Sequence, residues 1–404
     1  MGLSAFAFAR SIAAVGSRSM ARSLALVLAV TLAGCATQPR QPAVPARETA
    51  EATFLDIPDA RFSLTGNPSE LTRIFVAAER RAQMSGMRGT EHMLAISGGG
   101  EDGAFGAGLL YGWTERGDRP QFRLVTGVST GSLTAPFAFL GSRYDAQLQA
   151  VYTTVQRTDI VQILPVLTIL RSDSVGDSGP LARLIATHVT DEMVAEIGQE
   201  YQKGRMLLIG TTNLDLGQPI AWNIGAIAVS NHPRKVQAIR DILLASASIP
   251  GAFPPVMMDV MVGGTRRQEM HVDGGATTQV FLYPGNIPLR QAPPAVRRVP
   301  RVAWIIRNGR TQPLPEDVKR GLLQIAARSI STMITSNAIG DIYRMYLITR
   351  RDGVDFNLAY ISSRFTVPYE KPFDPPYMNA LFEFGRSESR SGSPWLKRPP
   401  GYVP

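Results

Sequence analysis

The chain has 404 residues, a single cysteine and a formal net charge of +9. Its apolar fraction of 44% and its charged fraction of 19% are ordinary for globular proteins, which excludes a wholly disordered chain, a collagen-like chain and a multi-span membrane protein. One cysteine excludes an internal disulfide framework, cysteine-rich zinc sites and iron–sulfur ligation.

The positive charge is divided unevenly along the chain. Residues 1–34 contain Arg10, Arg18 and Arg22 and no acid, which leaves +6 on the remainder. No dense run of Lys and Arg stands out there. This mild excess favours an ordinary solvated surface over nucleic-acid binding, and it is compatible with weak attraction to anionic lipid.

The first 35 residues have the pattern of a targeting signal. An apolar run of about a dozen residues follows Arg22, and a membrane span needs roughly 20. A basic flank, a short apolar core and small residues are typical of a secretory signal. The segment from Leu32 to Cys35 resembles the lipobox of bacterial lipoproteins, which implies a signal peptide over 1–34 and lipid attachment at Cys35. The alternative is an uncut short anchor with an incidental thiol.

The start and the end of this signal suggest two further points. Met20 would open a compact signal by itself, so the true start is either Met1 or Met20. Three prolines between residues 36 and 45 favour an extended tether over 35–60. Ala36 is not an aspartate, which by resemblance to the lipoprotein sorting pattern favours the outer membrane, with the protein facing the periplasm.

Beyond residue 60 the chain alternates between helical and strand patterns. A helix over 68–84 is predicted from one apolar face, formed by Leu71, Ile74, Phe75, Ala78 and Ala82. Short buried strands are expected at 93–96, 123–126, 206–209 and 302–306. Further helices are expected at 104–116, from 130 onward, and at 234–247 and 315–349. This alternation predicts one α/β domain over 61–395, followed by an extended tail over 396–404.

A glycine-rich loop from Gly98 to Gly103 joins a predicted strand to a predicted helix. Glycines let backbone N–H groups converge on an anion, either a nucleotide phosphate or the oxyanion of a tetrahedral intermediate. A dinucleotide site would want an acid near the end of the next strand, but 119–126 has none, and no P-loop lysine follows. The oxyanion use is therefore favoured, and a nucleotide-binding module is the weaker alternative.

The second motif runs from Gly127 to Gly131 and has the form G-x-S-x-G. It follows a strand and precedes a helix, as a nucleophile elbow requires, with Ser129 exposed on a turn whose neighbours must be small. The alternative is an ordinary glycine turn in which Ser129 caps the helix.

The third motif is Asp273, followed by Gly274 and Gly275. An aspartate there can face a cleft at a strand end, although the same pattern also makes a plain β-turn. Ser129 needs a base to become a nucleophile. His271 lies two residues before Asp273, so a Ser129–His271–Asp273 triad would demand an awkward geometry. A direct Ser129–Asp273 dyad needs no histidine.

The three motifs, in this order, resemble the patatin-like phospholipase family. The segments 104–110, 212–217 and 245–255 agree with the resemblance, which covers about residues 90–285. It implies a three-layer α/β/α sandwich with a mainly parallel central sheet, with Ser129 as nucleophile and Asp273 as general base. It further implies an oxyanion hole at Gly98, Gly99, Gly100 and Gly103, and turns supported by Gly127, Gly131, Gly274 and Gly275.

One position departs from the family pattern. The family usually has Arg or Lys where this chain has Asp102. A cation would help an anionic intermediate or a phosphate head group, whereas an acid would oppose both unless it points away. Asp102 therefore puts a preference for anionic phospholipids, and some of the activity, in doubt.

Together these features predict a membrane-anchored serine acyl-ester hydrolase of the phospholipase A, lysophospholipase or esterase type, which degrades lipid without a metal or organic cofactor. Its expected partners are a lipid substrate and the membrane, through Cys35, and not nucleic acid. The alternative is a catalytically weak protein of the same fold that binds lipid or a partner in the cell envelope.

Overall fold

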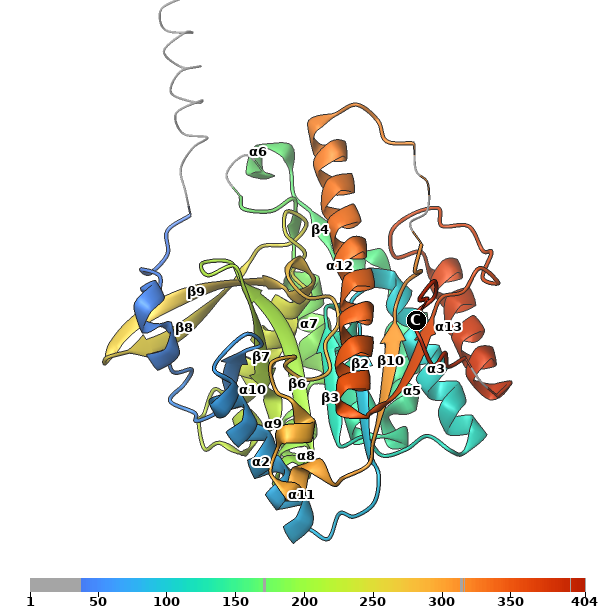
Figure 1. The fold of residues 1–404 in the computed structure, drawn as a ribbon. Helices are drawn as coiled ribbons and strands as arrows, with labels where there is room; N and C mark the ends of the chain where they lie inside the picture. Colours follow the sequence, from blue (N-terminus) through green and yellow to red (C-terminus); the bar gives the residue numbers. More distant parts are fainter. Residues whose placement is uncertain (1–37, 170–171, 313–314, 316, 393, 404) are drawn as a thin grey trace, which may run out of the picture.

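A mixed β-sheet forms the centre of the molecule (Figure 1). The computed structural model describes residues 38–403 except 170–171, 313–314, 316 and 393. The predicted signal peptide over 1–34 and the predicted lipid attachment at Cys35 lie outside the described residues. Within those residues, no helix combines the length and the apolar character that crossing a membrane requires.

In the described part of the chain, nine strands form this sheet, and its middle is parallel. The parallel strands lie in the order β6, β3, β2, β10 and β11, with bounds Met206–Asn213, Leu124–Val128, Glu91–Ile96, Arg301–Arg307 and Asp355–Tyr360. Every residue of β3 and β6 is buried, as expected where helices cover both faces of a parallel sheet. The predicted strands are confirmed, and β6, at 8 residues, extends well beyond the predicted 206–209.

The remaining strands are antiparallel and lie on the β6 side of the sheet. They are β1, β7, β8 and β9, with bounds Arg61–Ser63, Gln218–Asn223, Val256–Val262 and Thr265–Asp273. β7 pairs with β6, β1 pairs with β7, and β9 pairs with both β6 and β8. The sheet is therefore mixed, with a mainly parallel core, as predicted.

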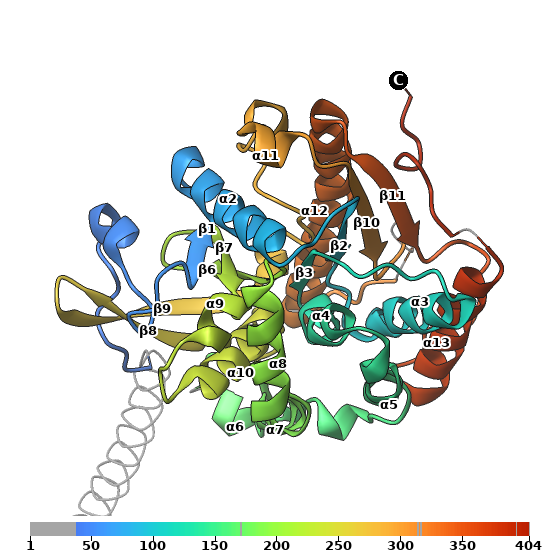
Figure 2. The ribbon, with the colours of Figure 1, turned by 90° about the horizontal axis from the view of Figure 1, so that it is seen from below.

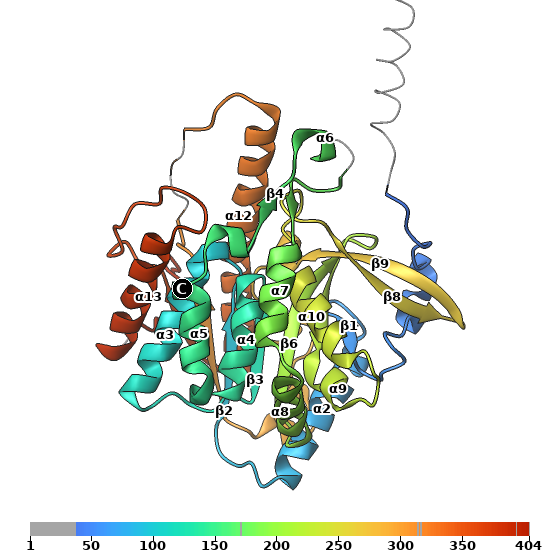
Figure 3. The same cartoon turned by 180° about the vertical axis from the view of Figure 1, so that it is seen from behind.

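Helices cover the sheet on both sides, which gives the predicted three layers (Figures 2 and 3). One layer contains α3, α4, α5, α7, α8, α9, α10 and α13, with bounds Gly103–Arg116, Thr130–Leu140, Asp145–Thr153, Gly179–His188, Asp191–Gln202, Ile224–Val229, Lys235–Ser246 and Pro375–Arg390. The opposite layer contains α2, α11 and α12, with bounds Pro68–Met84, Pro294–Arg297 and Leu322–Asp352. Two buried apolar clusters, one on each face, join these layers to the sheet.

The bounds of one predicted helix agree with the structure, and those of another differ. α2 has the predicted bounds, because Asn67 caps its first turn by accepting from the Ser69 N–H at 2.9 Å and Pro68 opens it. α12 begins only at Leu322, seven residues later than predicted. Gly321, which precedes it, has an extended backbone.

Both ends of the described chain are bound to the domain. Arg40 makes a bidentate ion pair with Asp215 at 2.7 and 2.8 Å, and Pro42 O accepts from the N–H of Gln268 in β9. The predicted tether is thus held against the sheet from Arg40 onward. At the other end, Leu396 forms a bridge with Leu358 of β11, so the tail adds a short edge to the sheet.

Candidate active site

Ser129 occupies a strained turn between β3 and α4. Its backbone has φ 55° and ψ −127°, a region that non-glycine residues rarely adopt. A Cβ on Gly127 would overlap the backbone of Gly131, and a Cβ on Gly131 would overlap the carbonyl of Ile96. Only glycine fits at both positions, which matches the small neighbours expected on either side of the serine.

Hydrogen bonds from distant segments hold this turn in place. The Ser129 N–H donates to Ser246 Oγ at 3.0 Å, and Ser246 Oγ donates to Gly210 O at 2.6 Å. The Ser129 side chain makes no capping hydrogen bond to α4. The alternative interpretation, in which the Ser129 hydroxyl caps α4, is therefore wrong.

The sheet register brings Asp273 to Ser129. β3 pairs with β6 as far as Val128, which lies opposite Gly210. β9 enters from the opposite direction and ends with Asp273 opposite Thr211, the next residue of β6. The two strand ends therefore meet on the same side of β6, and the Ser129 hydroxyl lies close enough to the Asp273 carboxyl to lower its pKa.

The Asp273 carboxyl is buried and accepts a hydrogen bond from the backbone. The Gly275 N–H donates to Asp273 Oδ1 at 2.7 Å. The backbone N–H of Asp273 donates to Ser248 O at 2.8 Å. Burial raises the pKa of Asp273 to about 6, although the hydrogen bonds from Ser129 and Gly275 oppose the shift. A carboxyl with that pKa is ionised at neutral pH and is a better proton acceptor than an exposed aspartate.

The glycine loop lies directly against the serine. A Cβ on Gly98 would come 3.0 Å from Ser129 Cβ, so a side chain there would crowd the serine. Gly98 N–H donates to Gln279 O at 3.1 Å, and Gly103 N–H donates to Gly100 O. Within the described residues, no backbone acceptor is recorded for the N–H groups of Gly99 and Gly100. Of the four predicted glycines, these two have donors free for an oxyanion.

Two buried side chains fix the direction of the Gly99 N–H. Ser97 Oγ donates to Gly98 O at 2.7 Å, and Arg307 Nη1 donates to the same oxygen at 2.9 Å. The peptide is trans, so the N–H of Gly99 points away from the carbonyl that these groups hold. Burial lowers the pKa of Arg307 to about 10, which leaves it cationic at neutral pH and able to polarise the peptide.

Sequence comparison identifies this arrangement. A profile described as patatin-like phospholipase matches residues 94–292, a range that contains the glycine loop, Ser129 and Asp273. This part of the chain belongs to the patatin-like phospholipase family. Membership implies the hydrolysis of lipid acyl esters, and it confirms the family resemblance drawn from the motifs.

Other comparisons add little to the patatin-like assignment. The crystal structure of VipD from Legionella pneumophila is similar at 11% sequence identity with a TM-score of 0.35, covering 90% of this chain and 73% of that chain. None of the curated proteins compared matches the sequence.

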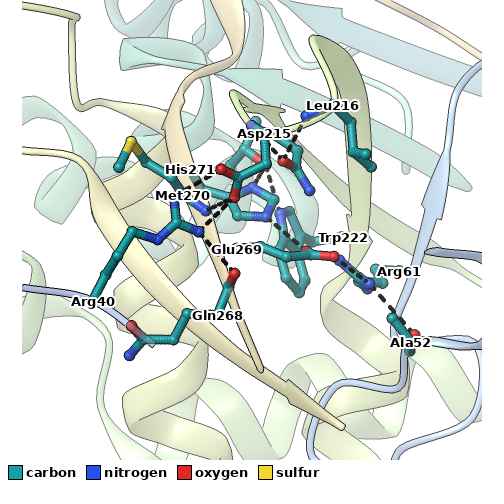
Figure 4. A network of polar contacts seen from close by, with 12 residues as sticks. Arg40, Ala52, Arg61, Asp215, Leu216, Trp222, Gln268, Glu269, Met270 and His271 are labelled. Atoms are coloured by element: carbon teal, nitrogen blue, oxygen red, sulfur yellow. Dashed lines mark hydrogen bonds and ion pairs between the residues drawn. The ribbon is translucent and has the colours of Figure 1, made fainter. Parts of the chain in front are cut away.

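His271 of the patatin-like domain is engaged elsewhere (Figure 4). Its Nδ1 lies 2.9 Å from Thr211 Oγ1, and its Nε2 lies 3.2 Å from Glu269 Oε2, which also pairs with Arg61. Burial lowers the pKa of His271. The ring is therefore a neutral, buried part of a structural network, and the awkward triad geometry foreseen from the sequence does not arise.

Asp102, at the position where the family usually has a cation, is half-buried. The Tyr377 hydroxyl donates to its Oδ1 at 2.8 Å. Burial raises the pKa of Asp102 to about 6, while the positive charges of Arg307 and Arg310 favour its ionised form. The patatin-like domain thus carries a cation under the loop, on β10, although it lacks one at residue 102.

Three residues that contact the site were missed from the sequence: Ser246, Gln279 and Arg307. Arg307 could have been noticed, because a charged residue at the end of the buried 302–306 strand lies at the same sheet edge as the motifs. Ser246 lies in the segment 245–255, which agreed with the family resemblance but gave it no role, and Gln279 carries no such signal. Among the described residues, no group of three or more His, Cys, Asp and Glu side chains is placed to bind a metal.

Proposed function

We propose that the protein is a serine acyl-ester hydrolase that cleaves membrane lipids with a Ser129–Asp273 dyad. The observation that carries this proposal is the meeting of β3 and β9 on β6, which places the strained Ser129 beside the buried carboxyl of Asp273. A strained turn persists only where the surrounding structure enforces it, which is common at catalytic serines.

The reaction follows from these positions. Ser129 Oγ attacks the ester carbonyl carbon while Asp273 accepts the hydroxyl proton, and the carbonyl oxygen becomes an oxyanion bound by the N–H groups of Gly99 and Gly100. Collapse of this intermediate breaks the bond to the alcohol, which leaves with the proton from Asp273. Asp273 then takes a proton from water, whose oxygen attacks the acyl-serine. Collapse of this second intermediate breaks the bond to Ser129 Oγ, which regains the proton from Asp273, and the fatty acid is released.

We further propose that the protein is a lipoprotein anchored through Cys35 in the outer membrane, facing the periplasm. The lipobox-like sequence before Cys35 and the position of the chain's only cysteine support this location. The test is incorporation of a labelled fatty acid during expression of the full chain. We expect label in the wild type and none in Cys35→Ser, and equal label in both would overturn the anchor.

Fluorophosphonate labelling tests the nucleophile, because these probes react covalently with activated serines. We expect the wild type and the control Ser142→Ala to be labelled, since Ser142 is exposed on another turn. Ser129→Ala should remain unlabelled and inactive on a short-chain ester while keeping its melting temperature. If Ser129→Ala is labelled as strongly as the wild type, the hydrolase proposal fails and the lipid-binding alternative gains.

A further inference from the structure

Two apolar segments project beyond the end of the sheet where Ser129 lies. One is the first half of α12, and the other is the segment 160–169, which contains β4 (Gln162–Ile163) and α6 (Val166–Ile169). Both rise above the body of the domain, and the view along the sheet places them on opposite sides of it (Figures 1 and 2).

The α12 projection starts beside the site. Asp341 in α12 accepts a hydrogen bond from the N–H of Gln279 at 2.7 Å, and Gln279 O in turn accepts from Gly98 in the loop. From Asp341 the helix continues toward its N-terminus for about 28 Å, at about 1.5 Å per residue. The first turns of α12 are thus far from the core that holds its second half.

These first turns expose large apolar side chains along one stripe. Leu322 is 85% exposed, Met333 58% and Ile325 52%. Their helical spacing places all three within about 80° of arc. Apolar side chains on one side of a projecting helix are expected where another apolar phase covers them.

The second segment is anchored on the other side of the dyad. Val175 N–H donates to Gly251 O and Gly176 N–H donates to Ala252 O, both at 2.9 Å, just beyond the Ser248 carbonyl that binds Asp273. Residues 160–169 contain no charged side chain, and Ile163 is 52% exposed. The two segments therefore flank the catalytic residues with apolar surface.

Charge and chain direction indicate what covers this surface. Lys319 and Arg320 precede α12, and no acid occurs from residue 318 to 340, which suits an anionic lipid surface. The described chain begins on the same half of the molecule as the two segments. Arg40 is fixed to Asp215, and at most about 17 Å of chain separates residue 35 from it.

We propose that α12 residues 322–333 and segment 160–169 form a membrane-docking surface that seats the domain on an anionic bilayer and admits lipid acyl chains between them to Ser129. This inference rests on the proposed function for its substrate. It commits to a bilayer as the occupant of the surface, and a second copy of the chain or a protein partner is an outcome that would overturn it.

A kinetic experiment on the full chain separates docking from chemistry. The double variant Leu322→Glu/Ile325→Glu is compared with Met84→Glu, since Met84 is 87% exposed on α2, away from the site. The substrates are vesicles of phosphatidylglycerol with phosphatidylethanolamine, and a water-soluble short-chain ester. We expect the double variant to lose about ten-fold or more on vesicles and to stay within about two-fold on the soluble ester.

The other outcomes have distinct meanings. Unchanged vesicle hydrolysis, or an equal loss on both substrates, overturns the docking surface and leaves the proposed function intact. An absence of Ser129-dependent hydrolysis of either substrate defeats the proposed function itself. In that case the location of the surface is judged by the binding measurement alone.

The binding measurement uses an environment-sensitive fluorophore on Ile325→Cys and, as control, on Met84→Cys; the chain without an added cysteine gives the background from Cys35. With vesicles that contain brominated phosphatidylglycerol, we expect quenching at residue 325 and none at residue 84. Equal quenching at both residues, or none at either, overturns the proposal. Shielding of residue 325 that rises with protein concentration without vesicles assigns the surface to a second copy instead.

Discussion

Two carboxyls of the site, the buried Asp273 and the half-buried Asp102, share almost the same pKa but not the same surroundings. Burial raises the pKa of both Asp273 and Asp102 to about 6. Asp273 lies beside the hydroxyl of Ser129, which stands on a strained turn, whereas Asp102 accepts a hydrogen bond from the hydroxyl of Tyr377, which stands on a regular helix.

The difference shows that a shifted pKa does not by itself identify a general base. What distinguishes Asp273 is the position of its hydroxyl partner, Ser129, beside a loop with free N–H donors. The positive charges of Arg307 and Arg310 favour the ionised form of Asp102, whereas no arginine in the described part of the chain shifts the pKa of Asp273.

The largest effect is expected from neutralising each carboxyl in turn. Asp273→Asn should lower kcat/KM for a soluble ester by ~10³–10⁴-fold, because the serine loses its proton acceptor. Asp102→Asn should change it by about two-fold or less, since this carboxyl contacts Tyr377 and not the serine. Steady-state kinetics measure both, and losses of equal size would contradict the distinction.

A smaller effect is expected from the arginine beneath the loop. Arg307→Gln should lower kcat by about 10²-fold with little change in KM, because the Gly98 carbonyl loses the donor that orients the Gly99 N–H. Arg310→Gln, which alters the charge near Asp102 without touching Gly98, serves as the control. Arg307→Lys should recover part of the rate, and an Arg307→Gln variant with normal kcat would refute the positioning role.

The pH dependence of kcat/KM should follow the ionisation of Asp273. Asp273 accepts a proton only when ionised, so kcat/KM should be at its plateau above pH 7 and should fall about ten-fold by pH 5, with a midpoint near 6. Asp102→Asn should keep the same midpoint. A midpoint that shifts in Asp102→Asn would assign the titration to Asp102 instead.

The smallest effect concerns stability. The folded-state pKa of Asp273 lies above its ordinary value of 3.8, so the native state binds more protons between pH 4 and 6. The contribution of this carboxyl to the free energy of unfolding is full below pH 4 and is lost as pH rises through 6. At pH 8 the free energy of unfolding of Asp273→Asn should therefore exceed that of the wild type by about 3 kcal/mol, with no gain at pH 4. Calorimetry at both pH values measures this, and a gain of equal size at pH 4 would argue against it.

Local chemistry explains why much of this site was predictable. The elbow at Ser129 and the bounds of α2 depend on neighbouring residues, which the sequence displays directly. The contacts of Arg307 and Gln279 depend on strand order, which short patterns do not encode. The apolar residues of 322–333 gave an ordinary helical pattern, because periodicity cannot tell whether a neighbour covers the helix.

The junction of β3 and β9 on β6 has a consequence for folding. Only three residue pairs join β9 to β6, and successive side chains alternate between faces, so a slip of one residue would turn Asp273 away from Ser129. This pairing closes a long loop of chain, and such distant pairings form slowly. Recovery of hydrolysis after dilution from denaturant should therefore lag behind recovery of the helical signal. The rate at which hydrolysis returns would then report the rate at which β9 pairs with β6.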